Sequence, residues 1–416
     1  MTLRRRLPAA LQQRDYALLW VALVVMGFAT QMAVVAIGWQ VYSFDHDPFD
    51  LGLIGLAEFL PLLVLALPAG QIADHFPRRF VFAFSLVIET GVLLALVVVS
   101  LDGATQLWPF LALAVATGVA GSLGAPSGRA LPTEVVGSEL LASAMALRSI
   151  AGQAAVIGGP VLGGVLFAIR PELVYGVAAA MLLVGLSCVL ALGPPLVARA
   201  RPEPAPRWET LLAGIGFIRR TPVILGAISL DLFAVLFGGA VALLPVFAKS
   251  ILHTGPAGLG VLRSAPAVGA LVAGIILVRR PLGHRTGRTL LGVVALFGAS
   301  MIVFGLSTSL PLSLLALGVS GYADMISMNI RSTTVALATP DPLRGRVNSV
   351  EGVFISASNE LGAFESGLAA ALIGATPAVV AGGAVTIGIA AIWPRFFPEL
   401  ARVDRLEDVQ PEWEPA

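Results

Sequence analysis

The sequence is poor in charge, cysteine and histidine. Only 12% of its 416 residues are charged, against about 25% in soluble globular domains. A single cysteine, Cys188, excludes a disulfide framework and a cysteine-ligated metal site. The four histidines are scattered and lack the spacing of metal ligands. We therefore expect no metal and no resident cofactor.

The sequence contains a single lysine, Lys249. The sequence has no Gly-x-x-x-x-Gly-Lys, the nucleotide-binding loop that ATP-driven transport by this chain alone would need. A formal net charge of +1 gives no field that favours nucleic acid. An enzyme would need a cluster of His, Asp or Glu with ligand spacing, and a receptor or scaffold would need a long soluble loop. Neither is present in the sequence, so both classes are disfavoured.

Long hydrophobic runs dominate instead. Hydrophobic residues make up 57% of the chain, and the mean hydropathy is +0.90. The basic start at Arg4–Arg6 precedes an apolar run too long for a signal peptide, so this run is the first span. With about 20 apolar residues per membrane span, the sequence predicts an all-α protein embedded in the lipid bilayer. Its twelve predicted spans lie near 17–43, 51–73, 80–100, 108–131, 140–168, 172–193, 221–248, 257–279, 289–308, 311–337, 348–373 and 376–396.

The basic residues predict the orientation. An even number of spans places both termini on one side. If that side is the cytoplasm, twenty of the 26 Lys and Arg residues fall in cytoplasmic segments, and only Arg170 and Lys249 lie outside. This asymmetry predicts a multi-pass protein of the cell (inner) membrane with both termini cytoplasmic.

A proline- and arginine-rich stretch divides the spans into six and six. The expected organisation is an N-terminal bundle at 1–193, a cytoplasmic linker at 194–220, a C-terminal bundle at 221–396 and a disordered tail at 397–416. Gly70 and Gly274 occupy comparable positions in the two halves, as do the segments 159–164 and 362–367. These matching offsets predict that the two halves arose by duplication.

The segment from Gly70 to Arg79 joins two spans and is predicted to be a tight polar loop. Its form, Gly-x-x-x-Asp-x-x-x-Arg-Arg, is carried by Gly70, Asp74, Arg78 and Arg79. It resembles the signature loop of the major facilitator superfamily, although the family's usual glycine is Pro77 here. The resemblance implies a loop that controls conformational switching. The alternative is a basic turn that only fixes topology.

The fifth span carries a second motif, formed by Gly159, Pro160, Gly163 and Gly164. Small residues let two helices approach closely, and a proline within a span permits a bend. The motif resembles the end of the fifth-helix motif of antiporters in the superfamily. The alternative is an ordinary small-residue packing contact.

The segment 339–349 resembles a recurring loop of one branch, which contains enterobactin-exporter-like proteins and drug–proton antiporters. The resemblance covers nearly the whole chain. It implies twelve transmembrane helices in two pseudo-symmetric six-helix bundles. It also implies a central cavity lined by the first, fourth, seventh and tenth helices.

Charged residues within the spans are candidates for the transport site, because each costs roughly 2.5–3.5 kcal/mol to insert. Asp231 in the seventh span and Asp324 in the tenth are the first candidates for proton coupling, since the resemblance implies that these spans line the cavity. Glu58 and Glu360 are further candidates. Arg331 follows Asp324 by two helical turns and shares its face. It is expected to pair with a carboxylate or an anionic substrate, and the alternative is a purely structural ion pair.

The acids of the eleventh span cannot all serve one site. Glu351 and Glu365 share one face of a helix, whereas Glu360 points to the opposite face.

Together these features predict a secondary active transporter that acts by alternating access. The expected activity is proton-coupled efflux of an amphipathic small molecule, such as a siderophore or drug, by a monomer. A proton-coupled importer of a small nutrient is the alternative.

Overall fold

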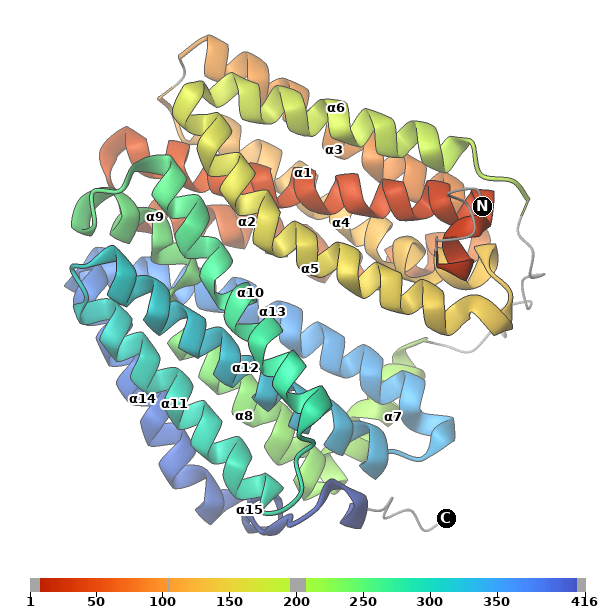
Figure 1. Ribbon diagram of the computed structural model, residues 1–416, viewed down its shortest axis with the longest axis vertical. Coiled ribbons are helices and arrows are strands. Elements are labelled where there is room, and N and C mark those ends of the chain that lie inside the picture. Colours follow the sequence, from red (N-terminus) through yellow and green to blue (C-terminus); the bar gives the residue numbers. More distant parts are fainter. Residues whose placement is uncertain (1–7, 104, 195–206, 410–416) are drawn as a thin grey trace. The chain divides into compact units, whose positions relative to one another are not determined.

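The computed structural model describes residues 8–103, 105–194 and 207–409, without the side chains of 66, 67, 73, 74 and 207–213. Throughout this described part the secondary structure is helical, and it contains no strand. Figure 1 labels the helices. Their bounds are α1 Arg14–Asp45, α2 Pro48–His75, α3 Arg78–Leu101, α4 Trp108–Val135, α5 Ser138–Ile169, α6 Pro171–Leu190, α7 Arg207–Arg220, α8 Pro222–Gly238, α9 Leu244–Val246, α10 Gly255–Arg279, α11 Thr286–Leu306, α12 Leu310–Ala338, α13 Asp341–Ile373, α14 Ala375–Phe396 and α15 Pro398–Arg402.

Eleven helical segments in the described residues are long and apolar enough to cross a membrane. One of them, Pro222–Ile251, comprises α8, a short 3₁₀ turn, α9 and a final π turn. The remaining predicted span corresponds to α13, which is long but carries charges that include Glu351, Glu360 and Glu365. The all-α membrane architecture expected from the sequence is therefore present.

Proline marks where several of these helices begin. Pro171, Pro222 and Pro398 are the first residues of α6, α8 and α15, where a missing N–H costs nothing and the fixed φ suits a helix. Pro77 is the N-cap of α3.

The prediction of a loop over Gly70–Arg79 was wrong for most of its length. Helix α2 continues through Gly70 to His75, so the connection to α3 is only Phe76 and Pro77. No residue before Pro77 forces the helix to end, and a continued helix keeps the backbone groups hydrogen-bonded at the membrane surface.

The helices form two compact units. Unit 1 comprises Met1–His46, Leu53–Glu203 and Thr254–Ser264, and unit 2 comprises Asp47–Gly52, Pro204–His253 and Ala265–Ala416. In unit 1, α1 packs against α5 and α6, while α3 packs against α4 and α6. In unit 2, α8 packs against α13 and α14, while α11 packs against α12 and α14. Helices α1 and α8 are the first spans of their halves, and α3 and α11 are the third. In both halves the first span packs against the fifth and sixth, and the third packs against the fourth and sixth, as expected for a duplicated chain.

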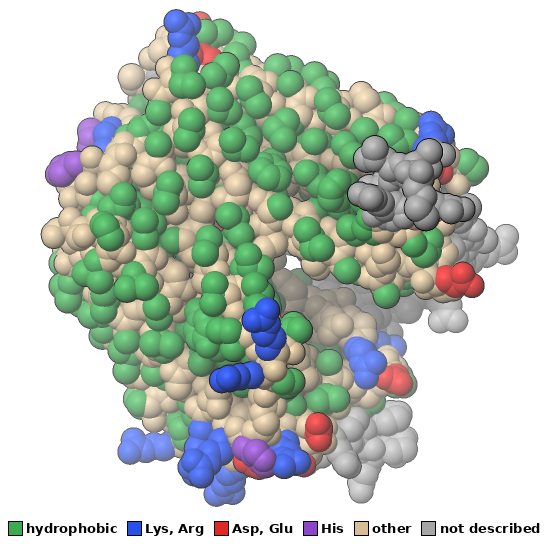
Figure 2. All heavy atoms as spheres, viewed as in Figure 1, with side chains coloured by type: hydrophobic (Ala, Val, Ile, Leu, Met, Phe, Trp, Pro, Cys, Tyr) green, Lys and Arg blue, Asp and Glu red, His purple; other side chains and the backbone are tan. Residues whose placement is uncertain are grey.

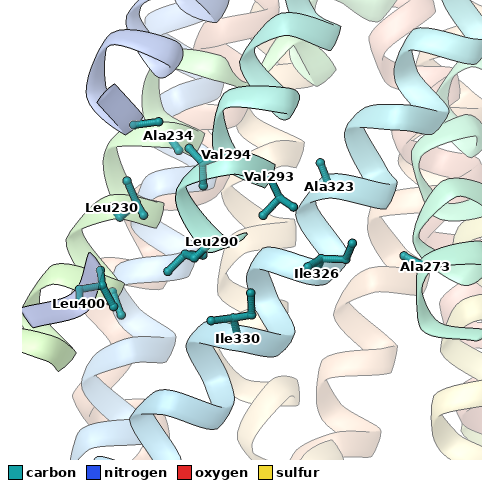
Figure 3. Close-up of a cluster of buried hydrophobic side chains, with 12 residues drawn as sticks. Leu230, Ala234, Ala273, Leu290, Val293, Val294, Ala323, Ile326, Ile330 and Leu400 are labelled. Atoms are coloured by element: carbon teal, nitrogen blue, oxygen red, sulfur yellow. The ribbon is translucent and has the colours of Figure 1, made fainter. Parts of the chain in front are cut away.

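The core of unit 2 is a cluster of aliphatic side chains from α8, α11 and α12 (Figure 3). Leu230, Leu290 and Ile330 each have at most 1% of their surface exposed. Leu400 of α15 belongs to the same cluster and is 2% exposed. The prediction of a disordered tail from 397 was therefore wrong up to Asp408, because Leu400 is anchored in this core.

Hydrophobic side chains cover much of the visible surface, and most of the charged and histidine side chains lie around its margin (Figure 2). Exposed large hydrophobics such as Val64, Val98 and Leu372 lie within the long helices. Lipid is the solvent that suits such a surface.

Candidate functional site

The candidate site is centred on an ion pair within unit 2. The guanidinium of Arg331 on α12 contacts the carboxylate of Asp231 on α8. Both residues are buried, with exposed fractions of 6% for Arg331 and 8% for Asp231. Arg331 Nε also donates to Ser327 Oγ, 3.3 Å away and one turn earlier on α12. Since an unpaired charge in such a place is very costly, each of these charges depends on the other.

The apolar core positions this pair. Leu230 and Ala234 flank Asp231 on α8, and Ile330 precedes Arg331 on α12. These aliphatic side chains pack α8 and α12 against α11 (Figure 3), which holds the two charges in a low-dielectric environment.

Asp324 lies two turns before Arg331 on the same face of α12. It lines a cavity of about 20 Å³ together with Asp231, Ser327 and Phe297. That volume accommodates about one water molecule. Asp324 is exposed whereas Asp231 is buried, so the cavity connects an accessible carboxyl to an inaccessible one.

Glu351 on α13 approaches the ion pair from another side. It lines a small pocket with Asp231, Arg331 and Ser358. The charges of Arg331 and Asp231 both act on Glu351. The site therefore combines three carboxyl groups with one guanidinium. The sequence predicted Asp231, Asp324 and Arg331 but not Glu351 as a member of this site.

The other two predicted acids lie elsewhere. Glu360 is on α13, nine residues after Glu351 and so on the opposite face, and it lines neither of the two cavities. Glu58 is on α2 in unit 1. Its backbone carbonyl oxygen lies close to Gly118 of α4.

The basic residues after α2 bind neighbouring helix ends in unit 1. Arg78 pairs with Glu134 at the end of α4, with an N–O distance of 3.0 Å. Arg79 donates from Nη1 to the carbonyl of Leu192, 3.0 Å away and just after α6. Gly70 lies within α2, and the side chain of Asp74 lies outside the described residues. The structure thus links α3 to α4 and α6 at this end, and the switching role stays a prediction.

The glycines of the fifth-span motif make close contacts within unit 1. A Cβ added to Gly163 would lie 2.8 Å from Cα of Met32 on α1, and one added to Gly159 would lie 2.6 Å from Cβ of Gln31. A Cβ on Gly164 would meet the carbonyl oxygen of Pro256 at the start of α10. Pro160 contributes its own carbonyl oxygen, which faces Gly260. The expected close packing is present, and its antiporter role stays a prediction.

A model of the family described as "Transmembrane secretion effector" matches residues 7–413. The chain belongs to this family. It is therefore a secondary transporter of the major facilitator superfamily, a multi-pass membrane protein that handles small molecules, and not an enzyme.

Named relatives and solved structures agree with this assignment. The enterobactin exporter EntS of Citrobacter koseri is 28% identical over 364 residues, which are 85% of each chain. The enterobactin exporter EntS of Shigella dysenteriae is 26% identical over 323 residues, 76% of each chain. A bacterial homolog of the human lysosomal transporter Spinster has the same fold, with a TM-score of 0.73, 16% identity and coverage of 97% and 99%. The nucleoside transporter NupG has a TM-score of 0.70 at 14% identity, with coverage of 92% and 99%.

Proposed function

We propose that this transporter exports an amphipathic small molecule of the siderophore or drug class in exchange for protons. Relatives named as enterobactin exporters support the direction and the cargo class, because they align with most of the chain. The D-xylose–proton symporter shares the fold at only 12% identity, so it does not favour the importer alternative.

The observation that supports proton coupling is the imbalance of charge around Arg331. Asp231, Asp324 and Glu351 would together carry three negative charges against one positive charge. Ionised carboxyls without partners are strongly disfavoured where the dielectric constant is low. Proton binding relieves the imbalance, so a site of this composition can load and release protons during a cycle.

The geometry supports an order for the proton movement. A proton binds the exposed carboxylate of Asp324 and passes through one water in the cavity to Asp231. Neutral Asp231 attracts Arg331 less strongly, so the guanidinium can pair with Glu351 on α13 instead. Release of the proton from Asp231 restores the original pair. Because the three groups come from α12, α8 and α13, this exchange of partners biases the packing of three helices.

We also propose that Arg331 contributes to cargo recognition in the same cycle. An anionic group of the cargo would compete with Asp231 for the guanidinium, because Arg binds carboxylate-like groups with charge-assisted hydrogen bonds.

The proposed organisation completes this account. Two six-helix bundles, 1–193 and 221–396, would alternate around a central cavity, with the linker 194–220 and both termini cytoplasmic. The chain would act as a monomer, because one copy supplies the whole charged site.

The direction of transport can be tested with membrane vesicles of both orientations. Cells expressing the protein would supply inverted and right-side-out vesicles, each energised by an imposed proton gradient. A panel of catecholate siderophores and amphipathic drugs would be offered to both. An exporter should load at least one cargo into inverted vesicles whose interior is acidic. Gradient-driven uptake into right-side-out vesicles alone would support the importer.

A further inference from the structure

Helices α1 and α6 leave an open groove on the surface of unit 1. Its volume is about 430 Å³, which is within the range of small-molecule binding sites. Both helices are spans, so the groove lies at membrane depth. We propose that it binds an acyl chain of an anionic phospholipid, whose headgroup is held at one end by Arg14 and Arg79. The residues that line the groove are Leu18, Leu183, Val184, Ser187, Cys188 and Ala191.

The walls of the groove suit a hydrocarbon chain. From Leu183 to Ala191 the groove follows about two turns of α6, roughly 12 Å at 1.5 Å per residue. Leu183 and Val184 are about half exposed, at 48% and 50%. The hydroxyl of Ser187 donates to the carbonyl of Leu183, 2.8 Å away, so this polar group is satisfied within α6. An apolar groove of this length favours a lipid tail over a polar ligand.

Two arginines lie at one end of the groove. Arg79 donates to the carbonyl of Leu192, the residue next to Ala191. Arg14 precedes Leu18 by one helical turn and therefore shares its face. Both arginines lie near Gly193. Arg79 Nη1 is 3.5 Å from the carbonyl oxygen of Gly193. Asp15, which is 3.9 Å from Arg14, has an Oδ2 that would lie 2.8 Å from a Cβ added to Gly193.

These arginines suit a phosphate group. The side chain of Arg14 is 75% exposed. The bonds from Arg79 use Nη1, and a guanidinium carries further N–H donors. The guanidinium of Arg79 also lies over the ring of Phe80, with Cζ 4.5 Å from the ring centroid. Asp15 offsets one of the two positive charges, so the end of the groove retains one excess positive charge.

The sequence before α1 is also basic. Arg4, Arg5 and Arg6 precede Arg14 within the same N-terminal segment. Basic residues beside the end of a span attract anionic lipids on the cytoplasmic side. With this end on the cytoplasmic side, as proposed above, a ligand with an anionic head here and an apolar tail along α6 is a phospholipid of the inner leaflet.

Cys188 provides a direct test, because it lines the groove and is the only cysteine of the chain. The purified protein in detergent would react with N-ethylmaleimide in the presence of phosphatidylglycerol or phosphatidylethanolamine with identical acyl chains. Labelling would be followed by intact mass. Phosphatidylglycerol should slow the reaction several-fold more than phosphatidylethanolamine does. Arg14→Gln should remove most of that difference, whereas Arg280→Gln, the same change at an exposed arginine of unit 2, should preserve it.

A second measurement tests the groove itself. In native mass spectrometry, Leu18→Trp should lose phosphatidylglycerol that the wild-type protein retains, because the indole fills the groove. Equal protection of Cys188 by both lipids, or an equal effect of Arg14→Gln and Arg280→Gln, would overturn the proposal. Protection by glycerol 3-phosphate would assign the site to a free phosphate ligand instead. Protection by a siderophore but by neither lipid would assign it to cargo.

Discussion

The carboxylate of Asp231 and the guanidinium of Arg331 form a buried ion pair that joins α8 to α12. Breaking such a pair by removing one partner typically costs about 3–5 kcal/mol, because the remaining charge is buried alone. Arg331→Met should therefore lower the thermal stability of the purified protein strongly. Asp231→Asn should lower it less, because Glu351 lines the same pocket and can pair with Arg331 in its place.

The double variant separates pairing from simple packing. If the pair matters through its charges, Asp231→Asn with Arg331→Met should be less destabilised than the sum of the two single changes. Thermal unfolding in detergent would measure all three variants. Additive losses would contradict a charge-based role for the pair.

The segment at the end of α2 gives a second prediction. Asp74→Asn should slow transport while the protein still inserts into the membrane, because the change removes a charge from the predicted switching segment. Initial transport rates in proteoliposomes, normalised to reconstituted protein, would measure this effect. A rate equal to wild type would contradict the predicted switching role of this segment.

The glycine contacts of α5 predict a local steric effect. Gly164→Val should impair efflux, because a Cβ at this position meets the carbonyl of Pro256. Overpacking of this kind costs about 1–3 kcal/mol. Gly152→Val on the same helix is a matched control, since nothing lies within 4 Å of a Cβ there. Efflux into inverted vesicles would be compared at equal membrane content. Equal loss in both variants would indicate a general effect of valine on the helix.

The segment after α15 predicts a pH dependence. Asp404 accepts hydrogen bonds from His284 Nδ1 at 3.0 Å and from the N–H of Arg285 at 2.9 Å. These bonds, the one from His284 first, hold the pKa of Asp404 below its usual value. The resulting stabilisation is complete above the ordinary carboxyl pKa of about 3.9. It is lost as the pH falls through the lowered pKa.

Hydrogen exchange at the start of α11 measures this docking. The amides of Thr286 and Gly287 donate to the carbonyls of Asp404 and Val403, so undocking should expose them. Asp404→Asn should accelerate their exchange at pH 7, and the variant should lack the acid-dependent step. Glu399→Gln, an exposed change in α15, is the control. Unchanged protection in Asp404→Asn would show that Leu400 alone anchors this segment.

The sequence predicted the spans because a membrane helix needs only local information, a run of about 20 apolar residues. The pairing of helices in each unit also followed the predicted duplication. The course of α2 beyond Gly70 did not follow from the motif, since polar residues at a span's end are compatible with both helix and loop. The docking of Leu400 depends on a core formed by distant helices.

The candidate site was predictable in its residue types but not in its pairing. Spacing alone placed Asp324 and Arg331 on one face, yet the partner of Arg331 is Asp231 on another helix. Glu351 was missed as a site residue because its approach to Arg331 depends on the packing of α13 against α8. One signal was available: Glu351, Phe354, Ile355 and Ser358 are spaced as one helical face, and all four line the same pocket.

The central claim, that Asp231 and Asp324 couple protons to export, is tested most directly by comparing two transport modes. Wild type, Asp231→Asn, Asp324→Asn and the control Glu360→Gln would be reconstituted with a transported cargo. Each would be assayed for accumulation driven by a proton gradient and for cargo exchange without a gradient. Both Asp variants should lose gradient-driven accumulation and proton flux but retain exchange, while Glu360→Gln retains both modes. Full gradient-driven accumulation in both Asp231→Asn and Asp324→Asn would contradict the account.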